Sequence, residues 1–176
     1  VEIGYYDTPG FAYGVAVLGS YVYIADHDHG LRVVNILNPA NPMETGSYDT
    51  PGSAYGVAVL GSFVYIADHD KGLQVVDISN PASPVKVGFY DTPGYAYEVA
   101  ISGSYAYVAD YLSLRVIDIS NPANPFELSY YDTPGYAWDL AILGSYAYIA
   151  DVSEGLRIVN ISNPSNPTEI GFYDTP

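Results

Sequence analysis

One stretch of sequence that occurs four times along the chain decides the fold. Its first copy, residues 6–47, reads YDTPGFAYGVAVLGSYVYIADHDHGLRVVNILNPANPMETGS. The pentapeptide YDTPG opens the copies at residues 6, 48, 90 and 131, and YDTP returns at residue 173. These landmarks are 42, 42, 41 and 42 residues apart. A period of this length is typical of repeat architectures in which each copy forms one supersecondary unit.

Each copy contains four short segments that favour β-strands. In the first copy they are AYGVAV (residues 12–17), YVYIAD (21–26), LRVVNI (31–36) and the segment before the next YDTPG. Gly, Pro, Asn and Asp separate the segments, and the pair Gly19-Ser20 suits a type II′ hairpin turn. None has the length or the 3.6-residue period of a helix. We therefore predict an all-β fold in which every copy is a four-stranded antiparallel meander.

The middle segments of each copy are apolar on both faces, as YVYIA and LRVVN show. A sheet that is buried on both faces needs a neighbour on each side, and stacking similar sheets around an axis provides it. We predict a β-propeller built from four internal repeats of about 42 residues. The expected blades span residues 11–52, 53–94, 95–135 and 136–176, with residues 1–10 as a surplus outer strand. A two-layer sandwich would need cleaner polar–apolar alternation.

The surplus strand leaves ring closure open. VEIGYYDTPG at residues 1–10 and TEIGFYDTP at residues 168–176 are versions of the same outer-strand segment. A lone four-bladed ring, a ring shared by two chains and a segment of a longer array all fit this pattern. We expect self-association as a dimer of four-bladed halves, because unclosed apolar end faces need partners and identical blades favour closed symmetry.

The charge balance narrows the classes of partner. The chain carries 20 Asp and Glu against 5 Lys and Arg, a net charge of −15. This excess argues against nucleic acid and anionic membrane surfaces, and it permits cations, basic proteins and neutral sugars. No apolar run approaches the roughly 18 residues of a membrane span. The chain has no cysteine, and it begins at Val1 without a leader, so we expect a mature or excised product.

Positions that differ between copies indicate where a ligand could bind. The residue after the first-strand aromatic is glycine in two copies but Glu98 and Asp139 in the others, and the aromatic itself changes from Tyr97 to Trp138. We predict a ligand-binding site formed by Tyr97, Glu98, Trp138 and Asp139 at the mouth of the central channel. An aromatic face beside carboxylates suits a sugar. The alternatives are that Trp138 is a packing variant of tyrosine, or that the two acids form a glycosidase pair.

Two acidic hairpins are candidates for a metal site. DHDHG (residues 26–30) and DHDKG (68–72) resemble half of a calcium loop, with Asp26, Asp28, Asp68 and Asp70 as ligands. The third acid and the distal glutamate of that pattern are missing, so a solvated turn is the alternative. The YDTPG motif is itself expected to serve turn chemistry, with its Asp bonding the backbone two residues on. We expect no cofactor, with calcium as the alternative.

The third segments and the links that follow them, LRVVNILNP, LQVVDISNP, LRVIDISNP and LRIVNISNP, resemble the LVIVD repeat. That family occurs in bacterial and archaeal propellers that are often secreted or surface-attached. The resemblance implies a propeller and an extracellular or cell-surface location, and it implies no shared activity.

Catalytic motifs are missing from the sequence. It contains no nucleophile elbow, phosphate-binding loop, dinucleotide fingerprint or H-E-x-x-H motif. We therefore expect a non-catalytic scaffold for protein interaction or assembly. The alternative is a carbohydrate- or calcium-binding module that uses the acidic, aromatic loop face.

Overall fold

The computed structural model describes residues 1–175, and within this range every regular element is a β-strand. This confirms the all-β prediction. The last residue of the fourth expected blade, 176, lies outside the described residues. Because the described part holds no helix, it also holds none that could cross a membrane.

The first two repeats each form a separate four-stranded antiparallel sheet. In the first, the strands follow the chain order β1 (Gly14–Leu18), β2 (Tyr21–Ala25), β3 (Leu31–Asn35) and β4 (Met43–Tyr48). In the second, the order is β5 (Gly56–Leu60), β6 (Phe63–Ala67), β7 (Leu73–Asp77) and β8 (Val85–Tyr90). Both sheets are the meanders that the repeat pattern predicts.

The third and fourth repeats differ from this expectation because they share one six-stranded sheet. Its strands are β9 (Ala96–Ser102), β10 (Tyr105–Asp118), β11 (Phe126–Leu143), β12 (Tyr146–Asp151), β13 (Gly155–Asn160) and β14 (Thr168–Tyr173). The first half of β10 pairs with β9 and its second half with β11, whose own second half pairs with β12. The third hairpin, DYLSL, lacks the glycine that ends the turn at Gly30 and Gly72, so the chain continues as strand.

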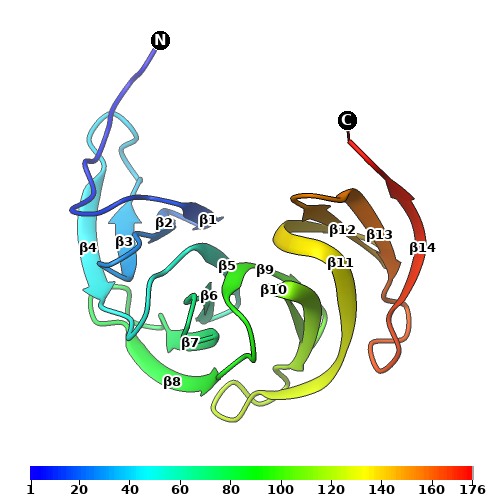
Figure 1. The fold of residues 1–176 in the computed structure, drawn as a ribbon. Helices are drawn as coiled ribbons and strands as arrows, with labels where there is room; N and C mark the ends of the chain where they lie inside the picture. Colours follow the sequence, from blue (N-terminus) through cyan, green and yellow to red (C-terminus); the bar gives the residue numbers. More distant parts are fainter. Residues whose placement is uncertain (176) are drawn as a thin grey trace.

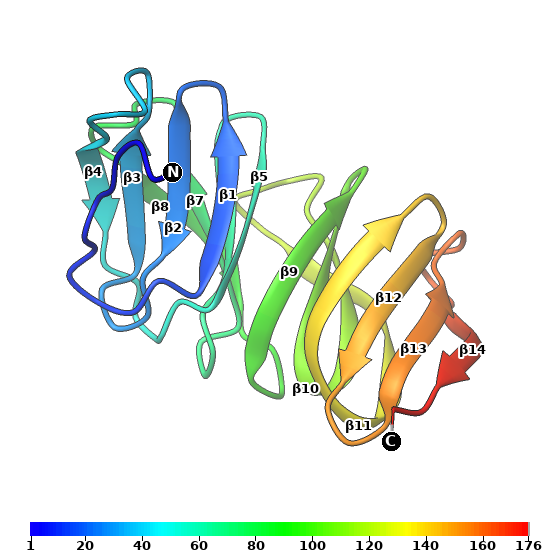
Figure 2. The same cartoon turned by 90° about the horizontal axis from the view of Figure 1, so that it is seen from above.

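The four repeats follow one another around an open arc (Figure 1). We call them units 1 to 4. Unit 3 comprises β9, β10 and the first half of β11, and unit 4 comprises the second half of β11 with β12, β13 and β14. Strands β1, β5 and β9 lie at the inside of the arc, and β4, β8 and β14 lie at its outside. Figure 2 shows units 1 and 4 at the two ends of the arc.

Neighbouring units pack through three equivalent apolar clusters. We call the face of a unit that meets the following unit its leading face, and the opposite face its trailing face. The first cluster joins the leading-face residues Tyr23, Ala25, Leu31 and Val33 to the trailing-face residues Ala54, Val57, Val64, Ile66, Val76 and Ile78. The same repeat positions build the second cluster (Tyr65, Ala67, Leu73, Val75; Ala96, Val99, Ala106, Val108, Ile117, Ile119) and the third (Tyr107, Ala109, Leu114, Val116; Ala137, Leu140, Ala147, Ile149, Val159, Ile161). Burial on both faces is therefore the rule inside the arc.

The two end faces expose residues that are buried at the internal junctions. On the trailing face of unit 1, Val15 is 67 % exposed, whereas its equivalents Val57, Val99 and Leu140 are 6 %, 3 % and 7 % exposed. On the leading face of unit 4, Ala150 is exposed, whereas its equivalent Ala25 is fully buried. Both end faces thus carry the surface of an internal junction.

Candidate functional site

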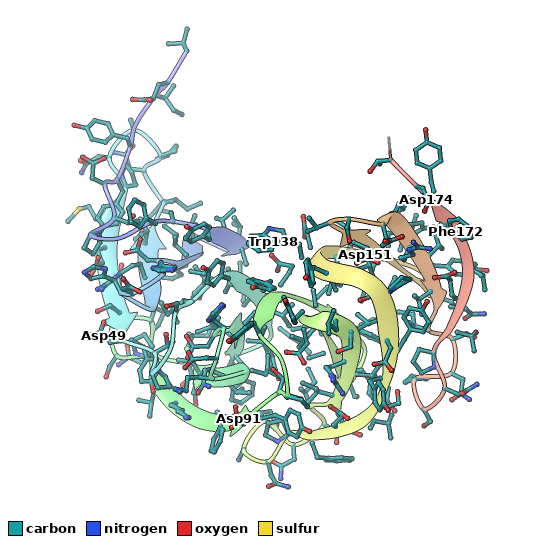
Figure 3. The ribbon with its side chains drawn as sticks, viewed as in Figure 1. Asp49, Asp91, Trp138, Asp151, Phe172 and Asp174 are labelled. Atoms are coloured by element: carbon teal, nitrogen blue, oxygen red, sulfur yellow. The ribbon has the colours of Figure 1, made fainter. Side chains whose placement is uncertain are left out.

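Aromatic rings from the first strands form a continuous stack along the inner edge of the arc. Tyr13 stacks on Tyr55 with ring centroids 4.7 Å apart, and Tyr97 stacks on Trp138 at 4.3 Å. Tyr55 and Tyr97 join the two pairs in an edge-to-face contact at 5.5 Å. Such offset and edge-to-face geometries are the favourable ones for aromatic rings. In Figure 3 Trp138 lies at the inner edge of the arc, between β1 and β11.

This stack borders a pocket of about 130 Å³ lined by Tyr13, Tyr55, Tyr97, Glu98, Trp138 and Asp139. All four predicted ligand-binding residues therefore meet in one place. Trp138 remains 47 % exposed, which leaves part of its ring free for contact. Tyr13 and Tyr55 also line the pocket, and they hold the same repeat position as Tyr97 and Trp138, which is the sequence signal that places them beside the site.

Glu98 is the electrostatically distinctive group of the pocket. Burial raises the pKa of its carboxyl to about 7, and the nearby charge of Asp139 adds to the increase. The Val99 backbone N–H donates a hydrogen bond to Glu98 Oε1 at 2.9 Å, which favours the charged form but does not offset the burial. Glu98 therefore changes charge near neutral pH. The site could hold a neutral polar ligand when Glu98 is protonated, and a cation when Glu98 is ionised.

His27 and His69 of the acidic hairpins take part in aromatic packing. His69 lies parallel to Tyr95 with ring centroids 4.4 Å apart and stacks on Tyr55 at 5.3 Å. His27 and His69 have positive φ angles of 46° and 48°. Their backbones form paired hydrogen bonds with Ala54 and Ala96 of the following unit. The hairpins thus connect neighbouring units, a role that the sequence reasoning did not assign to them.

A buried aspartate at the end of each second strand fixes the junction turn that leads into its own unit. Asp68 accepts hydrogen bonds from the Thr50 hydroxyl at 2.6 Å and the Gly52 N–H at 2.9 Å. Asp110 accepts the equivalent bonds from Thr92 and Gly94. The turn and the hairpin therefore lie on one side of each unit. The Thr and Gly of the YDTPG motif make these bonds, whereas its Asp in the copies at Asp49 and Asp174 accepts from an arginine instead of bonding the backbone as expected.

The four predicted metal ligands have other partners in the structure. Asp26 accepts a hydrogen bond from the Gly10 N–H at 3.0 Å, and Asp68 holds the Thr50–Gly52 turn. Asp28 lies 2.8 Å from His27 Nδ1, and Asp70 pairs with Lys71 at 2.8 Å. Among residues 1–175, no three or more His, Cys, Asp or Glu side chains are grouped so as to hold a metal ion. Calcium binding stays a prediction with no support from this geometry.

Three arginines neutralise part of the acidic surface where units meet. Arg157 lies within 4 Å of four carboxylates, including Asp151 at 3.6 Å and Asp174 at 3.4 Å. Arg32 and Arg115 occupy the same repeat position and pair with Asp26 and Asp110. Asp49 and Asp91 lie at the junctions that follow units 1 and 2, and Asp174 lies at the end of unit 4 (Figure 3). In unit 2 the position holds Gln74, so Asp68 has no arginine beside it.

Four repeats of antiparallel strands, joined by equivalent apolar junctions, define the class of this chain as an all-β repeat protein. The family model named LVIVD repeat matches residues 9–50, 51–92, 93–133 and 134–175. The chain therefore belongs to the LVIVD repeat family, as the resemblance suggested. The search of curated proteins found no match.

Among solved structures, the chain is similar to the computationally designed Ika8 protein, in a crystal structure described as crystal packing No.1 in P63. The TM-score is 0.73 at 10 % sequence identity, so the likeness concerns the fold alone. The match covers 93 % of this chain and 50 % of that chain. This chain thus spans about half the length of the structure it matches.

Proposed function

We propose that this chain is half of a β-propeller and acts as a non-catalytic scaffold that closes its ring with a second copy of itself. The observation that carries the proposal is the repetition of one junction three times within the chain. The exposed leading face of unit 4 and the exposed trailing face of unit 1 offer the two sides of a fourth such junction.

Head-to-tail docking of two copies forms this junction twice and leaves neither end face open. Closed rings are the usual outcome of such heterologous contacts when the rotation allows closure. Each internal cluster buries about ten apolar side chains. Full burial of one of the larger side chains, a valine, leucine or isoleucine, stabilises by about 1.5–3 kcal/mol, so a repeated junction is a strong driving force.

The test compares two apolar-to-charged variants. Val15→Glu places a carboxylate in the proposed interface, at a site that is exposed in the single chain. Leu37→Glu is the control, because Leu37 is 79 % exposed on the link after β3 and lies outside the repeated clusters. Sedimentation equilibrium should show a dissociation constant at least a hundredfold higher for Val15→Glu and an unchanged one for Leu37→Glu. Equal dissociation constants for the two variants would contradict the proposed interface.

A second candidate function is carbohydrate binding at the aromatic pocket. The observation that favours it is the exposed Trp138 ring beside Glu98 and Asp139, because sugars combine ring stacking with hydroxyl hydrogen bonds. A glycan array with and without calcium tests the proposal and separates it from calcium binding. Trp138→Ala should abolish binding, whereas Phe126→Ala, which removes an aromatic ring of similar exposure (48 %) on the outer part of β11, should not. No bound glycan in either condition would contradict this candidate.

The proposed location is outside the cell or at the cell surface. The support for it is the family resemblance. Fractionation of the producing cells with an antibody against the chain tests it, and recovery in the cytoplasm alone would contradict it.

A further inference from the structure

The N-terminal residues 1–7 lie on unit 1 in the way that an outer strand lies on the unit that follows it. At the internal junctions, Gly46 of β4 packs so closely on the Pro81–Ala82 backbone that a Cβ atom would overlap it, and Gly88 of β8 does the same on Pro122–Ala123. Gly4 packs in the same manner on Pro39–Ala40 of unit 1. The N-terminal segment therefore occupies the place of an outer strand that belongs to a preceding unit.

The tyrosine–glutamate contacts repeat this relationship. The Tyr131 hydroxyl donates to Glu169 at 2.6 Å, and the Tyr6 hydroxyl donates to Glu44 in the equivalent place. The turn after the segment is also held as at an internal junction, since the Gly10 N–H donates to Asp26. Residues 4–10 thus make the contacts of a complete outer strand and turn with unit 1. They have no strand beside them, because residues 1–8 belong to no sheet.

The C-terminal strand β14 shows the complementary half of the same junction. It pairs with β13 in an antiparallel register that contains one bulge, with Tyr173 opposite Leu156 and Thr168 opposite Asn160. Its glycine, however, has nothing to pack on: a Cβ at Gly171 would meet no atom within 4 Å. The segments VEIGYYDTP and TEIGFYDTP are nearly the same sequence. When two copies dock head to tail, both segments therefore fit one place, and one of them has to leave it.

We propose that the two copies exchange strands: residues 1–7 of one copy pair with β13 of the other and displace its β14. This inference rests on the proposed ring closure. At every internal junction the outer strand continues without a break through YDTPG into the first strand of the next unit. Residues 1–7 continue in this way into the turn held by Asp26, whereas a partner's β14 would reach that turn from another chain.

Exchange also keeps every contact that residues 4–10 already make with unit 1. The lost β13–β14 pairing is replaced by pairing of nearly the same sequence in the same register, with Tyr6 opposite Leu156 and Val1 opposite Asn160. Asp7 would take the place of Asp174 beside Arg157, and Glu2 would take the place of Glu169. Because the partner segment brings its own turn with it, each exchanged strand connects the two copies.

A matched pair of proline variants tests the exchange in the full chain. Tyr6 and Tyr173 occupy the same position in the two segments. Tyr173 lies opposite Leu156 in a hydrogen-bonded pair, so proline at this position removes a backbone donor that the paired strand uses. Exchange predicts that Tyr6→Pro raises the dissociation constant of the dimer at least tenfold, while Tyr173→Pro leaves it unchanged or lowers it. The reverse order would show that β14 keeps its place and would overturn the exchange while ring closure stands. A chain that stays monomeric at all concentrations overturns both.

A disulfide gives a second readout that does not depend on the strength of association. The chain has no cysteine, so the double variant Val1→Cys/Asn160→Cys contains a single designed pair. Directly opposed residues of antiparallel strands have Cα atoms about 4.5–5.5 Å apart, within the range that a disulfide spans. Exchange predicts a covalent dimer on a non-reducing gel after mild oxidation. The matched variant Thr168→Cys/Asn160→Cys places its two cysteines on β14 and β13 of the same chain. Under exchange, its disulfide within one chain should therefore form only in the monomer fraction. Covalent monomers from that variant in the dimer fraction would overturn the exchange.

Discussion

The Thr50 hydroxyl donates a 2.6 Å hydrogen bond to Asp68, and this bond joins the turn between units 1 and 2 to the buried end of β6. Thr50→Val should lower the free energy of unfolding by about 1–3 kcal/mol, because it leaves a carboxylate oxygen unpaired in a buried site. Thr8→Val is the matched control, since Thr8 donates only to the Gly10 carbonyl in the first copy of the turn. Urea denaturation of both variants checks the difference. An equal decrease in the free energy of unfolding for Thr8→Val and Thr50→Val would contradict the idea that the bond from Thr50 to Asp68 stabilises the turn.

Asp68, which has Gln74 rather than an arginine beside it, makes the stability of the chain depend on pH. Burial raises the pKa of Asp68 from its ordinary 3.8 to about 6. The folded state therefore binds this proton more tightly than the unfolded state, and stability falls as pH rises from about 4 through 6. Gln74→Arg would supply the cation that the other units have beside their aspartates. It should raise the melting temperature by a few degrees at pH 8, on the order of 1 kcal/mol, and have little effect at pH 4.

Gln74→Met is the control for this effect, because it changes the side chain without adding charge. Thermal melts of the three proteins at both pH values provide the measurement. If Gln74→Arg raised the melting temperature equally at pH 4 and pH 8, packing rather than the charge of Asp68 would be responsible.

Glu98→Gln should stabilise the chain in alkaline solution. Because burial raises the pKa of Glu98 from 4.5 to about 7, its ionisation in the folded chain lowers stability as pH rises from about 4.5 through 7. The glutamine variant avoids that loss, by an amount on the order of 2 kcal/mol at pH 9 and close to zero at pH 4. Chemical denaturation across this range checks it. Parallel pH profiles for the wild type and the variant would contradict the raised pKa.

Two glycines at the same repeat position should respond differently to alanine. Gly88→Ala places a methyl group into the Pro122–Ala123 backbone and should destabilise the chain by about 2 kcal/mol or more. Gly171→Ala meets open space and should be close to neutral. Differential scanning calorimetry of the two variants distinguishes them. A similar loss of melting temperature in both would contradict the close approach at the internal junction.

The sequence predicted the all-β fold and its four repeats well, because a fourfold repeat of strand and turn signals leaves few alternatives. The two-faced burial of YVYIA and LRVVN indicated the stacked junctions, and the varied positions Glu98 and Trp138 indicated the pocket. Residues that act through neighbouring units could not be found in this way. Nothing in the motif DHDHG shows that His27 bonds the next unit through its backbone, because that contact depends on how the units rotate against one another.

The merged sheet of units 3 and 4 also escaped prediction. Tyr111 takes the same left-handed conformation as His27 and His69, at φ 56°, but no glycine follows it as Gly30 and Gly72 follow them, so β10 continues into the next pairing. The place of residues 1–7 was equally hidden. The sequence shows that they repeat β14, but only the packing of Gly4 on Pro39 shows that they already lie where the strand of another unit belongs.

The solution mass of the unmodified chain tests the central claim of ring closure most directly. Light scattering coupled to size-exclusion chromatography, at micromolar concentrations and above, should give about 38 kDa, twice the 19.0 kDa of the single chain. A mass that stays at 19.0 kDa as the concentration rises would contradict closure between two copies.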